Sequence, residues 1–164
     1  MSVNSREKGK RGEREFAKLC RQYGYDARRS QQYAGGVDSA DVVGLPGIHV
    51  EVKLRDVITE GDKLAFMRQA IRDSAGSGNL PIVAHKENYR QWFVTMRMQD
   101  FVQMYVLAAD CNEIIDGVTE EIHTVTMTAE AWFAVYQEWH SSEELKKVEH
   151  TRFGKRLKKG MVIQ

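Results

Sequence analysis

The sequence predicts an α/β domain in which a mixed central sheet is flanked by helices. Helical and strand-like segments alternate in the order helix, three strands, helix, two strands. The second helix lies between the third and fourth strands, where it would serve as the crossover that parallel strands require. The 164 residues, 42% of them hydrophobic and 29% charged, suit one domain with its own core and are too few for two.

The first predicted helix covers roughly residues 5–23, because apolar side chains recur there at i, i+3, i+4 and i+7: Phe16, Leu19, Cys20 and Tyr23. Gly24 is placed to end this helix. Extended backwards at about 100° per residue, the apolar stripe takes in Gly9, Gly12 and Glu13. A carboxylate on an inward face needs a partner, since burying an unpaired charge is costly. Glu13 is therefore a candidate functional residue.

The sheet and its crossover helix are predicted from the next seventy residues. The predicted elements, in chain order, are a strand in 25–33, a glycine-bearing loop at 34–39, a hairpin of 41–45 and 48–54 around Pro46-Gly47, a helix at 60–75 with Asp62 as its N-cap, and strands at 80–86 and 91–97. Together they account for the central part of an α/β domain.

The C-terminal third is predicted to be an α+β extension, residues 98–151, packed on the core or at a dimer interface. The segments 94–105 and 125–136 share Val, Thr, Met and Tyr at matching places, and each predicts a strand running into a helix. A turn is expected at Asp116-Gly117 between them. The last helix carries aromatic side chains at helical spacing, typical of a core or dimer interface: Trp132, Phe133, Tyr136 and Trp139. Residues 152–164 are expected to form a basic tail.

Basic residues gather at both ends of a chain whose net charge is only +1. Residues 1–30 hold nine basic and four acidic groups, and residues 146–160 hold seven and one. Such segregation favours a polyanionic partner, although two solvated faces would give the same counts. No membrane span or signal-like segment is present, so we expect a cytoplasmic protein. Cys20 and Cys111 are expected to be reduced thiols.

Three charged residues lie in the otherwise apolar hairpin: Asp41, Glu51 and Lys53. A three-residue loop at 45–47 would place Asp41 directly opposite Glu51, and like charges so paired are destabilising unless something neutralises them. Lys53 projects from the same face as Glu51. A hard divalent cation such as Mg²⁺ or Mn²⁺ would remove the repulsion, and with the lysine it would suit hydrolysis of a phosphodiester. The alternative is an ordinary Glu-Lys pair on an exposed strand face.

These residues resemble a known family. Asp41 followed by Glu51-Val52-Lys53 resembles the motif of the PD-(D/E)xK nucleases, although Ala40 stands where the motif has proline. The segment from Lys8-Gly9 to Glu13 is similar to the opening of the first helix in archaeal-type Holliday junction resolvases. The resemblance covers roughly residues 6–97 and implies a restriction-endonuclease-like core within residues 1–97. It also implies a homodimer that cuts branched DNA at four-way junctions, in recombination or repair, and the small size would suit a phage or prophage gene.

The resemblance further implies roles for individual residues. Glu13, Asp41 and Glu51 would bind Mg²⁺, with Mn²⁺ able to substitute, and Lys53 would be the catalytic lysine. Ser39 would lie near the scissile phosphate. No nucleotide cofactor and no membrane partner are expected.

Four arginines flank the predicted site and are the best candidates for contacts to the DNA backbone: Arg11, Arg14, Arg28 and Arg29. Gln69 resembles a helix glutamine that related nucleases place near the metal, but it lies off the apolar stripe of its helix, which favours a surface role. His49 shares the strand face of Glu51, and a local hydrogen bond is its favoured role. Two other functions stay open: a linear-duplex endonuclease of restriction or repair type, and a non-catalytic DNA-binding module.

Overall fold

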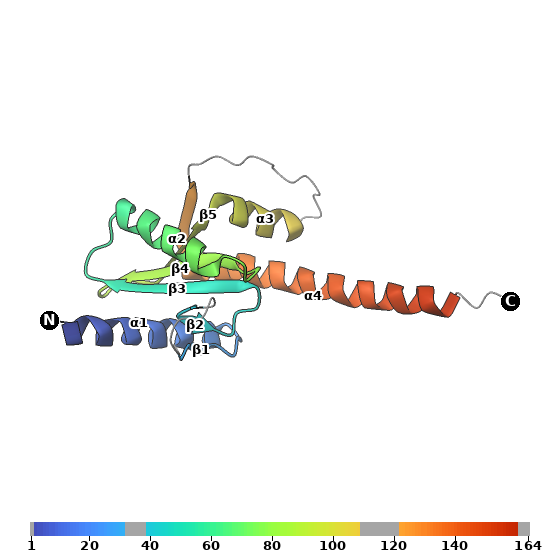
Figure 1. Ribbon diagram of the computed structural model, residues 1–164, viewed down its shortest axis with the longest axis horizontal. Coiled ribbons are helices and arrows are strands. Elements are labelled where there is room, and N and C mark those ends of the chain that lie inside the picture. Colours follow the sequence, from blue (N-terminus) through green and yellow to red (C-terminus); the bar gives the residue numbers. More distant parts are fainter. Residues whose placement is uncertain (1, 32–38, 109–121, 161–164) are drawn as a thin grey trace.

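A six-stranded sheet with helices on both faces forms the body of the protein, seen in a computed structural model that describes residues 2–31, 39–108 and 122–160 (Figure 1). The elements are α1 (Ser2–Gln22), β1 (Arg28–Arg29), β2 (Val42–Val43), β3 (Ile48–Arg55), α2 (Glu60–Ser74), β4 (Leu80–Glu87), β5 (Phe93–Arg97), α3 (Met98–Ala108), β6 (Thr124–Thr128) and α4 (Ala129–Gly160). The strands lie side by side in chain order. Among them only β3 and β4 pair in parallel, joined through α2, so the predicted mixed α/β sheet is confirmed.

The hairpin of β2 and β3 has the predicted register, with Val42 opposite Val50. Gly47 in the connecting loop has a φ of +75°, a conformation that glycine adopts without steric cost. Successive residues of β3 then point to opposite faces. Val50 and Val52 face α1, whereas Glu51 and Lys53 face the side of the sheet that α2 covers. The hairpin therefore separates the apolar core from the charged residues.

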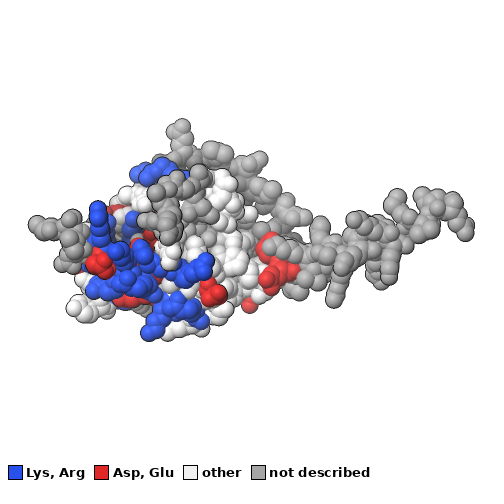
Figure 2. Space-filling model, turned by 60° about the horizontal axis from the view of Figure 1, so that its bottom comes forward, with Lys and Arg blue, Asp and Glu red and all other residues white. Residues whose placement is uncertain are grey.

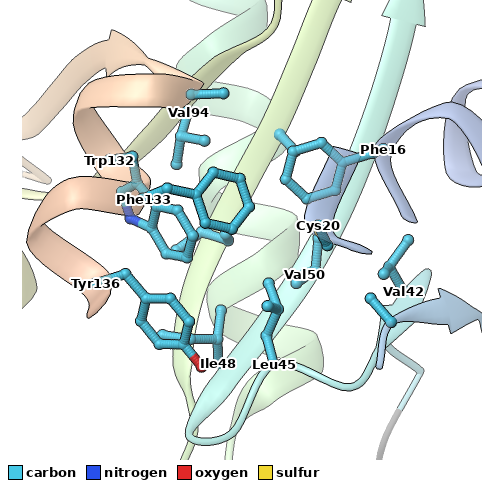
Figure 3. Packing of buried hydrophobic residues seen from close by; sticks show 14 of the residues in the cluster. Phe16, Cys20, Val42, Leu45, Ile48, Val50, Val94, Trp132, Phe133 and Tyr136 are labelled. Carbon is cyan, nitrogen blue, oxygen red and sulfur yellow. The ribbon is translucent and has the colours of Figure 1, made fainter. Parts of the chain in front are cut away.

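Aromatic side chains of α1 and α4 meet in the core on the first of these faces (Figure 3). Phe16 of α1 and Phe133 of α4 are both fully buried, and the ring of Phe133 stacks on Tyr23 with centroids 4.1 Å apart. Trp132 and Tyr136 are fully buried beside them. The aromatic stripe of α4, which was compatible with a core or a dimer interface, thus belongs to the core. Cys20 is buried and free, while Cys111 lies outside the described residues.

Two local predictions about element ends are wrong. The N-cap of α2 is Thr59, not Asp62, because the Thr59 hydroxyl accepts a hydrogen bond from Asp62 N at 3.1 Å and the Asp62 carboxylate accepts one from Thr59 N at 2.8 Å. This reciprocal capping box makes Glu60 the first helical residue, which is where the predicted range 60–75 begins. The first strand is also much shorter than expected, since β1 spans only Arg28–Arg29.

The last helix continues well past the sheet in Figure 1. α4 comprises 32 residues and ends at Gly160, so residues 152–160 continue the helix and do not form a separate tail. The turn expected at Asp116-Gly117 lies outside the described residues. In the described part of the chain, none of the helices combines the length and apolar character needed to cross a bilayer.

Replacing Phe133 by alanine should destabilise the whole domain, because the change empties the contact between α1 and α4. The expected loss in the free energy of unfolding is about 3–5 kcal/mol, measured by urea denaturation. Glu138→Ala, an exposed change on the same helix, serves as the control and should have little effect. A Phe133→Ala variant as stable as the wild type would contradict this packing.

Candidate active site

Asp41 forms hydrogen bonds to the edge of β3 through both its backbone and its side chain. β2 is only two residues long, so within the described residues most of this edge of β3 has no neighbouring strand. The backbone N–H of Asp41 donates to Val50 O at 2.8 Å, and its Oδ2 accepts a hydrogen bond from Val52 N at 2.8 Å. These two bonds hold the Asp41 carboxylate beside the strand that carries Glu51.

The electrostatics of this carboxylate pair are unfavourable when both groups are ionised. Burial raises the pKa of Asp41 to about 7, and the charge of Glu51, followed by that of Glu13, adds to the rise. The hydrogen bond from Val52 and the charge of Lys53 act in the opposite direction. Glu51 itself is 3% exposed. The register predicted from the sequence thus does bring two acidic groups into repulsive proximity, as expected for a hairpin paired in this way.

Lys53 is held by two partners on the α2 side of the sheet. Its Nζ lies 2.7 Å from Glu51 Oε1 and donates a hydrogen bond to Gln69 Oε1 at 3.0 Å. The ammonium group also lies 5.2 Å from the centre of the Phe66 ring. Gln69 Nε2 in turn lies 3.4 Å from Asp73 Oδ2. The site therefore includes residues of α2 as well as the hairpin.

Gln69 is the residue that sequence reasoning misplaced, since the surface role favoured for it is wrong. It lies off the apolar stripe because it faces the lysine and not the apolar core. A signal was present in the spacing: Phe66 and Gln69 are three residues apart, so they share one flank of the helix, and both contact Lys53. His49 is fully buried on the strand face of Glu51.

Glu13 reaches the site region from α1 but is engaged by an arginine. Its Oε2 forms a short ion pair with Arg29 Nε, and both side chains are partly buried. The inward direction predicted for Glu13 follows from the packing of α1 on β3, since a Cβ added to Gly12 would lie 3.0 Å from the Cβ of Leu54. Arg29, which is predicted to contact DNA, pairs with Glu13 in this structure, and its contact to DNA stays a prediction.

The three carboxylates predicted to bind metal, Glu13, Asp41 and Glu51, do not form one cluster in the structure. Across residues 2–31, 39–108 and 122–160, no three His, Cys, Asp or Glu side chains lie close enough together to hold a metal ion. Asp41 and Glu51 do fit a hard cation, because Mg²⁺ is commonly bound by one or two carboxylates completed by water and substrate phosphates. Glu13 as a third ligand would have to exchange its partner Arg29, and its role stays a prediction.

Basic side chains gather over the face on which α1 lies (Figure 2). Arg11 and Arg14 are exposed there and, with Lys8, line a hollow of about 550 Å³. Lys8 also pairs with Asp56 at 2.6 Å. Arg28 is exposed on β1, and Ser39 is half-buried two residues before Asp41. Glu7 and Asp56 also line this hollow, so its three basic side chains exceed the acidic ones by one.

Opposed carboxylates on an antiparallel hairpin, with a lysine two residues beyond the second, define the class of PD-(D/E)xK nucleases, as the motif had implied. The family described as "Phage putative PDDEXK endonuclease" matches residues 4–147, and the chain belongs to this family. The protein is therefore an endonuclease of the PD-(D/E)xK superfamily.

One solved structure similar to this chain is that of Hjc from Archaeoglobus fulgidus, a Holliday junction resolvase of an archaeal hyperthermophile. The two share 20% sequence identity over 79% of this chain and 88% of that chain, with a TM-score of 0.41. Among curated proteins, none matches the chain.

Without metal, the contribution of Asp41 to the stability of the protein should fall as pH rises through the range in which Asp41 ionises. The folded-state pKa of about 7 lies above the ordinary value of 3.8, so the folded state favours the protonated carboxyl. This contribution to the free energy of unfolding should therefore decrease between these two values and level off above the higher one. Burial lowers the pKa of His85 to about 4, which acts in the opposite direction over part of the same range, so the effect is measured as the difference in thermal melting, in EDTA, between wild type and a variant without the Asp41 carboxyl.

Asp41→Asn removes the titrating group but keeps an oxygen that can accept the hydrogen bond from Val52 N. This variant should melt above the wild type at pH 8, and the gap should close at pH 4. Asp26→Asn, a change at an exposed position, is the control and should reproduce the wild-type profile. Parallel profiles of Asp41→Asn and wild type would show that folding does not raise the pKa of Asp41.

Proposed function

We propose that the protein is a Mg²⁺-dependent endonuclease, with Mn²⁺ able to substitute, that cuts branched DNA at four-way junctions as a homodimer. The observation that carries the chemistry is the pair of half-buried Asp41 and buried Glu51, with the amine of Lys53 2.7 Å from Glu51. Structural ion pairs are normally formed by opposite charges. Two acidic groups beside one lysine leave negative charge in excess, which suits a site for a cation.

In this proposal each residue has a distinct part in phosphodiester hydrolysis. Asp41 and Glu51 would hold the cation, which when bound polarises the phosphodiester and lowers the pKa of a water molecule. Lys53 places a positive charge where negative charge develops on the phosphate oxygens. Gln69 accepts a hydrogen bond from the same amine and so fixes its position, because a lysine side chain alone has many rotamers.

Junction selectivity is the finer part of the proposal. It is supported by the Lys8-Gly9 to Glu13 segment, which resembles that of junction resolvases, and by the basic surface of α1. Contacts to phosphates position DNA without reading its sequence, so this surface suits recognition by shape. Resolving a junction requires two opposed cuts, and a homodimer supplies the two sites.

The deciding experiment compares a labelled four-way junction with a linear duplex built from the same arms. Wild-type protein with Mg²⁺ should cut the junction in paired positions, whereas EDTA or Glu51→Gln should abolish cutting. Equal cleavage of the duplex would support the linear-duplex enzyme and overturn the junction selectivity. Binding without cleavage by the wild type would leave only the DNA-binding module.

Lys53→Ala should lower the cleavage rate by about 10²–10³-fold, since it removes a group aimed at the developing charge. Gln69→Leu should lower the cleavage rate by a smaller factor, because the lysine amine is retained and only the hydrogen bond that fixes its position is lost. Neither change should alter DNA affinity by more than a small factor, as measured by fluorescence anisotropy in EDTA. A Lys53→Ala enzyme that cuts at the wild-type rate would refute the assigned role.

Arg11→Ala and Arg14→Ala should weaken DNA binding and reduce its dependence on salt. Each lost phosphate contact lowers the slope of log K against log salt by about 0.9, and the measurement is a salt titration of binding. Arg72→Ala, at an exposed position of α2 that does not line this hollow, is the charge-matched control. An unchanged slope in the double variant would mean that the hollow on α1 does not receive DNA.

A further inference from the structure

The turn between β4 and β5 presents a tyrosine that the fold does not use. Tyr89 is fully exposed, and its φ of +62° is the one positive value among the described residues other than glycine. Arg90 N donates to Glu87 O at 3.2 Å, which places Tyr89 at the third position of a four-residue turn. Glycine or asparagine is favoured there because a side chain crowds the backbone. Neither burial nor backbone conformation therefore explains the aromatic ring.

Contacts to neighbouring elements hold this turn in place. Asn88 N donates to Arg55 O at 3.1 Å, and the Asn88 side chain hydrogen-bonds to Asp56. Glu87 Oε1 accepts a hydrogen bond from Ile58 N at 2.8 Å. Because the first two residues of the turn are tied to the end of β3 and the segment that follows it, the ring of Tyr89 is presented from a backbone that is anchored on one side.

The ring borders a hollow of about 420 Å³ that contains both positive charge and apolar surface. The hollow is lined by Arg11, Glu15, Leu54, Lys86, Asn88 and Tyr89. Arg11 also lines the larger hollow on α1, so the two hollows adjoin at this residue. Lys86 is paired with Glu15 at 3.2 Å and lies 5.6 Å from the ring of Trp92. Arg11 pairs with the same Glu15 at 3.7 Å, so two cations and one carboxylate lie between α1 and the exposed ring.

The ring also lies at the same end of β3 as the candidate catalytic residues. Asn88 bonds to Arg55, which is two residues beyond Lys53 on β3. At roughly 3.3 Å per residue this is about 7 Å along the strand, comparable to two base-pair steps. The hollow lies on the α1 side of the sheet, because Leu54 and Lys86 are paired in the sheet and both line it, whereas Lys53 faces the α2 side. DNA that reaches both would pass around the end of β3.

We propose that Tyr89 and the hollow beside it bind an unpaired DNA base, with the ring stacking on the base and Arg11 and Lys86 contacting the flanking phosphates. Exposed aromatic rings next to cations are the usual means of holding single-stranded nucleic acid, and stacking tolerates any base. A fully paired duplex keeps its bases stacked on one another and offers none to the ring. This inference rests on the proposed function and narrows its substrate to DNA that carries unpaired bases.

The test compares three variants in EDTA, which prevents cleavage. Tyr89→Gly removes the ring and places glycine at the positive φ, so the variant should fold at least as well as the wild type. Tyr89→Phe keeps the ring. Tyr105→Ala removes another exposed tyrosine, from α3, and is the matched control. The probes are a duplex with a single-stranded flap that carries 2-aminopurine at its first unpaired position, and a blunt duplex of the same sequence.

Tyr89→Gly should bind the flap substrate about tenfold more weakly than the wild type, within the range measured for loss of one stacked base. It should bind the blunt duplex within a factor of two. Wild type and Tyr89→Phe should quench the 2-aminopurine fluorescence, whereas Tyr89→Gly should not. Tyr105→Ala should match the wild type in every measurement.

Undiminished binding of the flap by Tyr89→Gly would overturn the inference, and so would an equal loss on both probes. Cleavage of the same probes in Mg²⁺ separates this inference from the proposed function. Wild-type protein that cuts no DNA overturns the proposed function, whatever the binding result. Wild-type protein that cuts, together with Tyr89→Gly that binds and cuts the flap equally well, overturns the role of Tyr89 alone.

Discussion

The aromatic contact between α1 and α4 is the interaction on which the candidate site depends. Phe133 and Tyr136 of α4 pack against the aromatic residues of α1 and the segment that follows it, and the Tyr136 hydroxyl donates to Pro46 O at 2.9 Å. A Cβ on Gly47 would lie 2.9 Å from the Trp139 ring, so α4 approaches the hairpin as closely as glycine allows. The hairpin that carries Asp41 and Glu51 is thereby held against both helices, and part of the C-terminal third serves to support the strands of the candidate site.

This support explains how an unfavourable pair of charges persists in the folded protein. Burial and the nearby Glu51 raise the pKa of Asp41, so ionising it opposes folding. Burial of large aromatic side chains on the other face of the same strands contributes in the opposite direction. Folded proteins tolerate local repulsion of this kind where the surrounding structure compensates for it, and such places are often functional sites.

Part of the site was predictable because it follows from local rules of chain geometry. The two-residue period of a strand and a three-residue loop are enough to oppose Asp41 to Glu51 and to put Lys53 on the same face. The period of the helix was enough to turn Glu13 inward. The capping box of α2 was present in the sequence as Thr59 and Asp62, yet the aspartate alone was taken as the cap. Local sequence patterns thus contain the information for a contact where both partners lie within one element or one hairpin.

The sequence by itself determined the order of the elements, the register of the hairpin and the identity of the charged residues on it, because each depends on neighbours a few positions apart. Only the tertiary structure decided that Arg29 pairs with Glu13, that Gln69 contacts Lys53, and that the α4 aromatics join the core and not a dimer interface. Each of these contacts joins residues from separate elements. No periodic pattern specifies them, since they depend on how helices and sheet pack and on which long side chains reach across the gap.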